Sequence, residues 1–202
     1  MTTLGPRARG KLDKRERIRE AANELFLERG YDATTTKEIA ERAGVATGTL
    51  FLYARDKPDL LCLVMHDRLA ESVDAAVASL PRDEPLLEQL MHLFGGLFRM
   101  YGEVPGLAAE FVKIVPSADG PNGIKVSALT FAFLHHLMRL LTEAKARGEV
   151  AADIDPLRAA RNIFALYFAA LMGWLSRLET LEAALDPGLR GSLALQIRGL
   201  AR

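Results

Sequence analysis

Apolar residues recur along the chain at the three- and four-residue spacing of helices, and no alternating β-branched run flanked by hairpin turns is present. The first amphipathic set is Ile18, Ala21, Ala22, Leu25 and Phe26. This pattern predicts a helix over about 13–29. Gly30 should end it, because glycine accepts the left-handed conformation of a helix stop. We therefore expect an all-α protein.

Two short helices follow close together. Thr35 and Glu38 have the spacing of a capping box, so a helix should begin there and end at Gly44. Residues 44–46 alone separate it from a further short helix, predicted over about 47–54. Two short helices joined by a tight turn with glycine cross steeply, which is the arrangement of a helix-turn-helix.

Longer helices occupy the rest of the chain, and aspartate or proline marks several of their starts. Asp56 should cap one of them, and the pairs Asp155-Pro156 and Asp186-Pro187 should begin two others. The predicted ranges are about 57–80, 86–101, 106–115, 124–147, 155–178 and 187–200. The expected total is about nine helices.

The composition is that of an ordinary globular protein, with 50% hydrophobic and 26% charged residues in 202. Basic and acidic residues number 26 each, so the whole chain is not a general binder of polyanions. Charge is nevertheless segregated, because residues 7–19 hold seven basic and two acidic side chains. The basic residues of this segment are Arg7, Arg9, Lys11, Lys14, Arg15, Arg17 and Arg19. Such an arm can bind an anionic partner, and a solvated tail or the exposed face of a helix is the equally weighted alternative.

Several features point to the cytoplasm. The single cysteine, Cys62, excludes an internal disulfide. The longest uncharged stretch, residues 162–176, is shorter than the roughly twenty residues that a transmembrane helix needs, so no membrane association is expected. The basic N-terminus has no apolar core after it, so it does not resemble a signal peptide.

Residues for catalysis do not converge. Cys62 lies in an apolar run and should be packed and inert. His135 and His136 are adjacent and would point about a hundred degrees apart on a helix, which disfavours a shared metal ion. Gly95-Gly96 favours a close helix crossing or a bend over a phosphate cradle. We therefore expect no enzyme activity, metal or cofactor.

The second short helix carries the strongest functional pattern. Thr47, Gly48 and Thr49 are small enough to let the backbone approach DNA, and threonine can contact thymine methyls, base edges or phosphates. Leu50 should face the core. The next three side chains, which cannot all be buried on so short a helix, are Phe51, Leu52 and Tyr53. A plain helical hairpin in a ligand-binding or scaffold protein without a DNA target is the alternative.

Residues 14–61 resemble the DNA-binding domain of the TetR (tetracycline-repressor-like) family of bacterial regulators. The motifs are R-x-x-I-x-x-A-A-x-x-L-F at 15–26, G-Y-x-A-T-T at 30–35, I-A-x-x-A-G-V at 39–45, G-T-L-F at 48–51 and K-x-x-L-L at 57–61. The resemblance implies a helix-turn-helix domain over 1–56 and a helical effector-binding and dimerisation domain over 57–202. It further implies a homodimer that binds a palindromic operator and is released by a small molecule.

The resemblance also assigns DNA contacts to individual residues. Thr36 and Lys57 would bind phosphate, and Phe51 and Tyr53 would pack on the sugar-phosphate backbone. The residues that would face bases are Ala46, Thr47 and Thr49, with Gly48 allowing close approach. Ala54 stands where the family commonly has a large aromatic residue, so we expect Leu52 to supply packing beneath this helix as well as lying at the DNA-binding surface.

The C-terminal part suggests a dimer interface and an effector pocket. Residues 163–175 are apolar on all sides, so the helix should be covered on two sides, by its own domain and by a partner chain. The expected interface residues are Phe164, Phe168, Leu171, Trp174, Leu175, Leu193 and Ile197. A largely apolar effector would contact Phe94, Phe98, Tyr101, Phe111, His135, Met138 and Tyr167, although these residues suit an ordinary core equally well.

Overall fold

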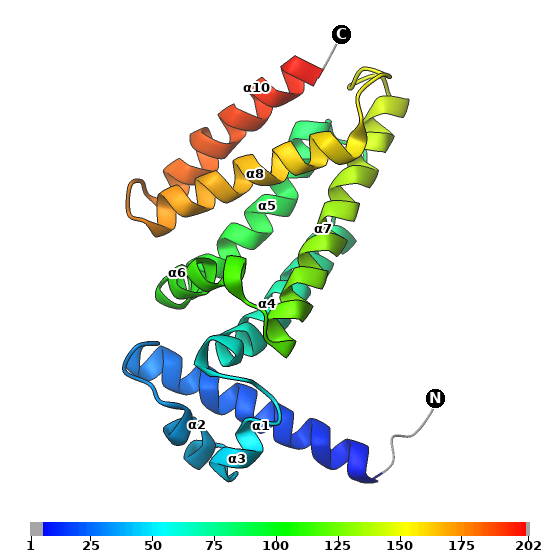
Figure 1. The fold of residues 1–202 in the computed structure, drawn as a ribbon. Helices are drawn as coiled ribbons and strands as arrows, with labels where there is room; N and C mark the ends of the chain where they lie inside the picture. The colour runs from blue at the N-terminus through cyan, green and yellow to red at the C-terminus, as the bar shows by residue number, and fades with distance from the viewer. Residues whose placement is uncertain (1–5, 201–202) are drawn as a thin grey trace. The chain divides into compact units, whose positions relative to one another are not determined.

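The computed structural model describes residues 6–200, without the side chains of residues 6–9 and 11. Every regular element in that range is a helix, as the apolar spacing predicts. The longer helices are α1 (Pro6–Arg29), α4 (Lys57–Ala78), α5 (Leu86–Glu103), α6 (Pro105–Ile114), α7 (Pro121–Ala146), α8 (Pro156–Leu175) and α10 (Arg190–Leu200) (Figure 1). The shorter elements are α2 (Thr36–Arg42), α3 (Thr47–Leu50), η1 (Val115–Ser117), α9 (Leu181–Ala183) and η2 (Ala184–Leu189).

The chain folds into two compact units. Unit 1 contains the residues up to 68 together with 106–127, and unit 2 contains 69–105 and the residues from 128 onward. Helices α4 and α7 therefore each contribute residues to both units. This division differs from a linear boundary at residue 56, because α6 and the first turns of α7 pack with the N-terminal helices.

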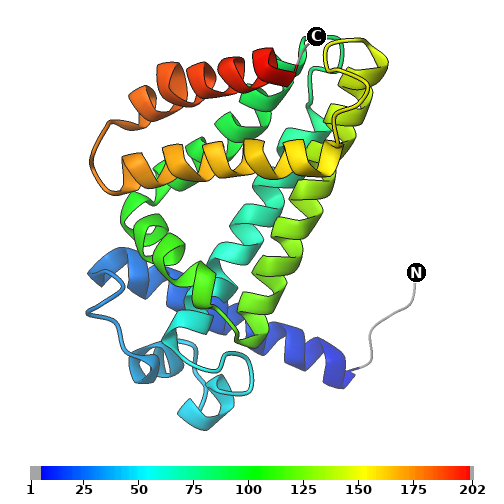
Figure 2. The same ribbon diagram turned by 45° about the horizontal axis from the view of Figure 1, so that its top comes forward.

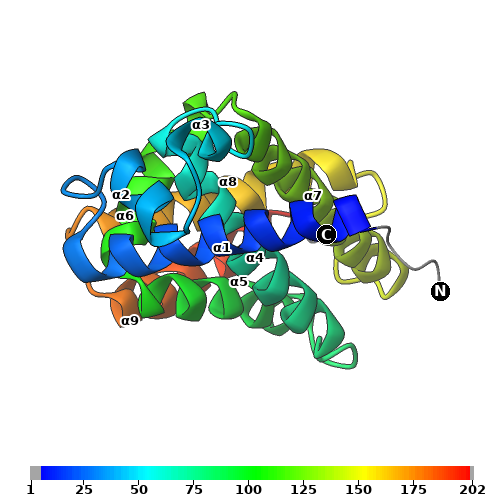
Figure 3. The same cartoon turned by 90° about the horizontal axis from the view of Figure 1, so that it is seen from below.

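The core of unit 1 joins the first three helices. Ile18 and Leu25 of α1, Ile39 of α2 and Leu50 of α3 are all buried. These are the positions that the helical spacing places on inner faces, and Leu50 faces the core as predicted. Figures 1 and 3 show α2 lying beside α1 and α3 lying beside α2.

The ends of two N-terminal helices differ from the sequence-based prediction. Helix α1 begins at Pro6 instead of Asp13, because proline is tolerated in the first turn of a helix and Gly10 does not interrupt the helix here. Helix α3 ends at Leu50, and turns extend it only as far as Tyr53. The basic segment is therefore part of a helix, and the predicted DNA-reading helix is short.

Unit 2 is built around an antiparallel pair of helices and an aromatic cluster. Figures 1 and 2 show α8 and α10 lying side by side and running in opposite directions. The Phe94 and Tyr167 rings stack with centroids 4.7 Å apart, and Phe98 meets Tyr167 edge-on. A Cβ atom added to Gly96 would lie 3.3 Å from the Ala76 Cβ, so Gly96 permits the close approach of α5 to α4, whereas Gly95 has only Arg99 of its own helix nearby.

The aspartate-proline pairs behave differently from one another. Asp155 caps α8 as predicted, because its carboxylate accepts hydrogen bonds from the amides of Leu157 and Arg158. Asp186 instead has an extended backbone conformation within η2, and α10 begins only at Arg190. The last helix is therefore shorter than predicted.

Among the described helices, α7 is the one long and apolar enough to cross a membrane by length and composition. Its residues Phe133, Leu137 and Leu141 are nevertheless buried within the fold. A single helix of this kind is weak evidence of a membrane span, because a core helix passes the same length and composition test. We therefore do not interpret α7 as a membrane span.

Candidate nucleic-acid interface

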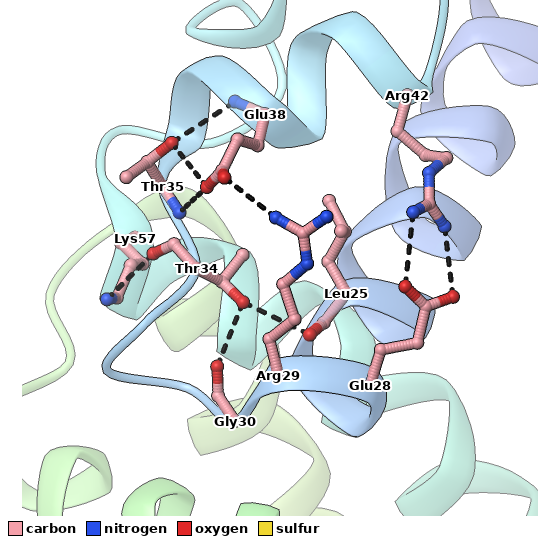
Figure 4. A network of polar contacts seen from close by, with 9 residues as sticks. All are labelled: Leu25, Glu28, Arg29, Gly30, Thr34, Thr35, Glu38, Arg42 and Lys57. Carbon is pink, nitrogen blue, oxygen red and sulfur yellow. Dashed lines mark hydrogen bonds and ion pairs between the residues drawn. The ribbon is translucent and has the colours of Figure 1, made fainter.

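Helix α2 is held in place by a capping box at its start. The Thr35 hydroxyl accepts a hydrogen bond from the Glu38 amide, and the Glu38 carboxylate accepts one from the Thr35 amide at 2.9 Å (Figure 4). Arg29, at the end of α1, pairs with the same carboxylate at 2.9 Å. Hydrogen bonds from the Thr35 side chain and backbone lower the pKa of Glu38 below its ordinary value. The start of α2 is thus tied to the end of α1.

A second ion pair ties the other end of α2 to α1. Both guanidinium nitrogens of Arg42 lie 3.1 Å from the two carboxylate oxygens of Glu28, in the paired geometry that gives the strongest arginine–carboxylate contacts (Figure 4). Glu24 adds a further contact at 3.1 Å. The hydrogen bond from Arg42 lowers the pKa of Glu28. Helix α2 is therefore a rigid support for the residues that follow it.

The turn after α2 presents α3 with its small residues toward solvent. Gly44 has a φ of +63°, a conformation that a side chain would strain, so the sharp turn depends on glycine. Thr47 and Gly48 are exposed, and Thr49 is half-buried. A Cβ atom added to Gly48 would meet nothing within 4 Å. The protein's own packing therefore does not require a glycine at this position.

The residues after α3 form an exposed apolar edge. Phe51 and Leu52 are 46% and 79% exposed, and Tyr53 is half-buried. Ala46, before α3, is also exposed. The expectation that Leu52 packs beneath α3 is wrong, because its side chain points to solvent while Ala54 is buried in its place.

Lys57 has internal partners that the sequence did not reveal. Its ammonium donates hydrogen bonds to the carbonyl oxygens of Asp32 and Thr34 and lies 4.4 Å from the centre of the Tyr31 ring. Thr34 itself is buried, and its hydroxyl donates to the carbonyl oxygens of Leu25 and Gly30 (Figure 4). Lys57 thus anchors the loop between α1 and α2.

Much of the basic segment on α1 is also paired internally. Arg15 and Arg19 both lie near the Asp67 carboxylate of α4, at 3.5 and 3.6 Å, and Arg17 lies 3.5 Å from Asp13. Lys14 remains exposed. The predicted contributions of Arg7, Arg9 and Lys11 lie outside the described side chains.

Lys37 is a candidate that sequence analysis missed. It occupies the first turn of α2 beside the half-buried Thr36, and its side chain is 78% exposed. Its nearest ion-pair partner, Glu41, is 3.9 Å away, at the limit of a salt bridge. The sequence did contain one indication of this role, because Lys37 directly follows Thr36, the predicted phosphate contact.

The unit-1 geometry has a counterpart among known proteins. A model of the bacterial regulatory proteins of the tetR family matches residues 18–62, which include α2, α3 and the start of α4. The relatives described below extend the similarity over most of the chain. The chain belongs to the TetR family.

Three relatives illustrate the similarity of this TetR-family chain. It is 29% identical to the transcriptional repressor KstR of Rhodococcus jostii over 82% of this chain and 74% of that protein. It is 24% identical to the fatty acid metabolism regulator of Bacillus subtilis over 82% of this chain and 85% of that protein. The structure of Thermus thermophilus FadR, a TetR-family repressor in complex with lauroyl-CoA, is 27% identical over 93% of this chain and 95% of that chain, with a TM-score of 0.74.

TetR-family regulators are DNA-binding proteins and not enzymes, so no catalytic role is assigned to this TetR-family chain. Cys62 is buried, and burial raises the pKa of its thiol to about 12. Because the thiolate is the reactive form of cysteine, this thiol is expected to be inert.

The predicted effector residues fall into three places. Phe94, Phe98, Tyr101 and Tyr167 are buried together in unit 2, and burial raises the pKa of both tyrosines, which hydrogen-bond to each other. Phe111 is buried and belongs to unit 1. The exposed His135 and half-buried Met138 line a surface groove of about 610 Å³, with Phe131, Leu134, Leu157 and Arg161. The predicted set is therefore divided between the cores of the two units and the surface of unit 2.

The predicted dimer residues divide in a similar way. Leu171 and Leu193 are buried within the protomer, because they lie on the helix faces turned toward its own core. Their side chains are thus not available to a partner chain in this structure. The half-buried members are Phe164, Phe168, Trp174, Leu175 and Ile197. Two large apolar residues nearby in sequence, Leu178 and Leu195, are 84% and 67% exposed.

Proposed function

We propose that this TetR-family chain is a ligand-responsive transcriptional repressor that binds a palindromic operator as a homodimer. The observation that carries the proposal is α3 itself. Its large residue, Leu50, is buried, while Thr47 and Gly48 are presented to solvent on a helix braced by α2. A short, braced helix with a small polar face is suited to the major groove.

The proposed contacts divide into base reading and phosphate binding. Ala46, Thr47 and Thr49 face base edges, with Gly48 permitting close approach of the backbone. Thr36 and Lys37, at the start of α2, bind phosphate and set the register on the duplex. Phe51, Leu52 and Tyr53 pack against the sugar-phosphate backbone, which accounts for the exposure of the first two.

A homodimer supplies the discrimination that one short helix lacks. Each good base contact contributes only ~1–3 kcal/mol, so two symmetry-related helices are needed to recognise an operator of useful specificity. The proposed interface uses the outward faces of α8 and α10, where Phe168, Trp174 and Leu195 are half-buried or exposed. Leu171 and Leu193 are excluded from it because they are buried in the protomer.

We propose a long-chain acyl-CoA thioester as the effector. Thermus thermophilus FadR was solved with lauroyl-CoA, and the Bacillus subtilis relative is a fatty acid metabolism regulator. The aromatic cluster of Phe94, Phe98 and Tyr167 provides an apolar environment suited to an acyl chain. The ligand releases DNA by binding better to the conformation in which the two recognition helices do not match the operator. The protein would act in the cytoplasm.

Selection of bound fragments from the source genome tests the DNA part of the proposal. The expected result is a palindromic sequence bound as a dimer, with an affinity that falls steeply with salt as phosphates are neutralised. Adding lauroyl-CoA should then release the selected fragment, while free CoA at the same concentration should not. Absence of any salt-dependent, sequence-selective binding would instead favour a helical ligand-binding protein without a DNA target.

A further inference from the structure

A buried carboxylate lies directly behind the candidate DNA-binding surface. Asp59, in the first turn of α4, is 3% exposed. Its two oxygens accept four hydrogen bonds, from the amides of Arg55, Asn122 and Gly123 and from the side-chain amide of Asn122. No cation forms an ion pair with it among the described residues. A buried charge held by neutral donors alone depends on every one of them.

The carboxylate acts as the N-cap of another helix. The amides of Asn122 and Gly123 belong to the first turn of α7, where they have no intrahelical acceptor, and Asp59 Oδ1 receives them at 2.9 and 3.1 Å. Gly120 precedes this turn and cannot cap it with a side chain. A Cβ atom there would lie 2.4 Å from the same oxygen. The glycine thus makes room for a cap supplied from α4.

Asn122 extends the connection to the end of the DNA-reading segment. Its side chain is 2% exposed, and its Nδ2 donates to the Tyr53 carbonyl oxygen at 2.9 Å as well as to Asp59 Oδ2 at 3.1 Å. Tyr53 closes the turn that follows α3. One amide group therefore joins α7, α4 and the end of the recognition segment.

Salt bridges of Arg55 add a second connection near these hydrogen bonds. The Arg55 guanidinium contacts the carboxylates of Asp119 and Asp56 at 2.6 and 3.0 Å. The hydrogen bond from Arg55 lowers the pKa of Asp119. This second link again joins the segment after α3 to the loop before α7.

We infer that Asp59 and Asn122 are positioning residues that set the orientation of α3 from the first turn of α7. Helix α7 continues into unit 2, so a displacement of α7 along its axis acts directly on the hydrogen bonds to Tyr53 and Asp59. Helix α3 then keeps its DNA-binding orientation only while the first turn of α7 keeps its hydrogen bonds to Tyr53 and Asp59. The positioning of α3 does not depend on the proposed function. Only the measurement of operator affinity rests on that proposed function.

Asn122→Ala in the full chain tests the inference, because it removes the side-chain hydrogen bonds to Tyr53 and Asp59 and leaves the backbone bond to Asp59. It also removes the weaker hydrogen bond that Lys125 donates to Asn122 Oδ1 at 3.4 Å. The matched control is Asp155→Ala, which removes an aspartate cap from α8 in unit 2. Operator affinity, affinity for random DNA and thermal unfolding are measured for both variants. Asn122→Ala should lower the ratio of operator to random affinity about tenfold, roughly the effect of losing one or two buried hydrogen bonds. Asp155→Ala should leave that ratio unchanged.

Amide hydrogen exchange gives a readout that needs neither an operator nor an effector. Exchange at residues 53–55 should become faster in Asn122→Ala and stay unchanged in Asp155→Ala. Asn122→Ser retains one hydrogen-bond donor and should give exchange rates between those of wild type and Asn122→Ala. This variant is used for the test if the alanine variant does not fold. An unaltered affinity ratio with unaltered exchange at residues 53–55 would overturn the inference. If wild-type protein selects no DNA, the proposed function fails, and the exchange experiment still decides this question.

Discussion

The Lys57 ammonium donates a hydrogen bond to the Thr34 carbonyl oxygen at 3.0 Å, and this contact changes the role expected of the lysine. A second bond to the Asp32 carbonyl at 3.1 Å occupies another of its three donors. Lys57→Met, which keeps the apolar stem, should therefore lower the free energy of unfolding by about 1.5–3 kcal/mol, the range for hydrogen bonds to a charged group. Urea unfolding measures this loss.

Lys37→Met is the matched comparison, because this lysine is highly exposed and has one distant ion-pair partner. It should leave the unfolding free energy nearly unchanged and reduce the salt dependence of DNA binding by about two units of slope, one for the phosphate contact of each protomer. The assignment of the two lysines is wrong if Lys57→Met alters only the salt dependence while Lys37→Met alters stability.

The DNA-reading helix could be predicted from sequence because its signals are local. The capping box of Thr35 and Glu38, the glycine turn at Gly44 and the small residues from Thr47 to Thr49 all lie within fifteen residues of one another. Each of these features determines the local backbone conformation or the size of a side chain, so it can be interpreted without knowing which distant residues pack nearby. The structure places these features as predicted.

The residues that sequence reasoning missed depend on distant partners. Asn122 and Asp59 are 63 positions apart, and the sequence D-G-P-N-G at 119–123 gives no sign that its asparagine lies in the first turn of α7, buried against α4. The predicted effector residues include both core and surface positions for a related reason. Aromatic residues at helical spacing suit any core, so the pattern could not separate Tyr167, which is buried, from His135, which is exposed.

The capping box predicts an acid-sensitive contribution to stability. The folded-state pKa of Glu38 is lowered, first by hydrogen bonds from Thr35 and then by Arg29. A lowered carboxylate pKa stabilises the fold at pH values above the ordinary glutamate value of about 4.3, and this stabilisation is lost as the pH falls through the folded-state pKa. Glu38→Gln keeps an acceptor for the Thr35 amide but removes the charge. The variant should therefore be less stable than wild type at pH 7.

The stability difference between the two proteins should disappear in acid. Comparing urea unfolding of wild type and Glu38→Gln from pH 7 down to about pH 3 isolates this group from the other carboxylates, which are common to both proteins. A difference that persists unchanged across this range would show that the Glu38 charge contributes nothing.

The proposed dimer interface is tested by placing a charge on α10. Leu195 is 67% exposed in the protomer, so Leu195→Glu should be tolerated by the single chain but should oppose burial against a partner. The mass in solution is expected to fall from about twice the chain mass toward the 22.2 kDa of one chain. Sedimentation velocity gives this mass directly.

Leu27→Glu is the control for that experiment, because Leu27 is 51% exposed on α1 in unit 1. It introduces the same charge outside the proposed interface and should leave the dimer intact. Equal dissociation in the two variants would point to a general effect of the added charge, and a Leu195→Glu protein that remains dimeric would place the interface elsewhere.

Gly48 separates a role in DNA binding from a role in folding. It lies within α3, its φ is not positive, and a Cβ atom there would meet no protein atom within 4 Å. Alanine is a better helix former than glycine by about 0.8–1.0 kcal/mol in a helix interior, so Gly48→Ala should keep or slightly raise the stability of the protein. Operator affinity should nevertheless fall, because the added methyl group stands on the face proposed to approach the bases. Thermal unfolding and operator titration on the same preparation check both statements. A variant that is at least as stable as wild type and binds the operator equally well would remove Gly48 from the DNA-reading face.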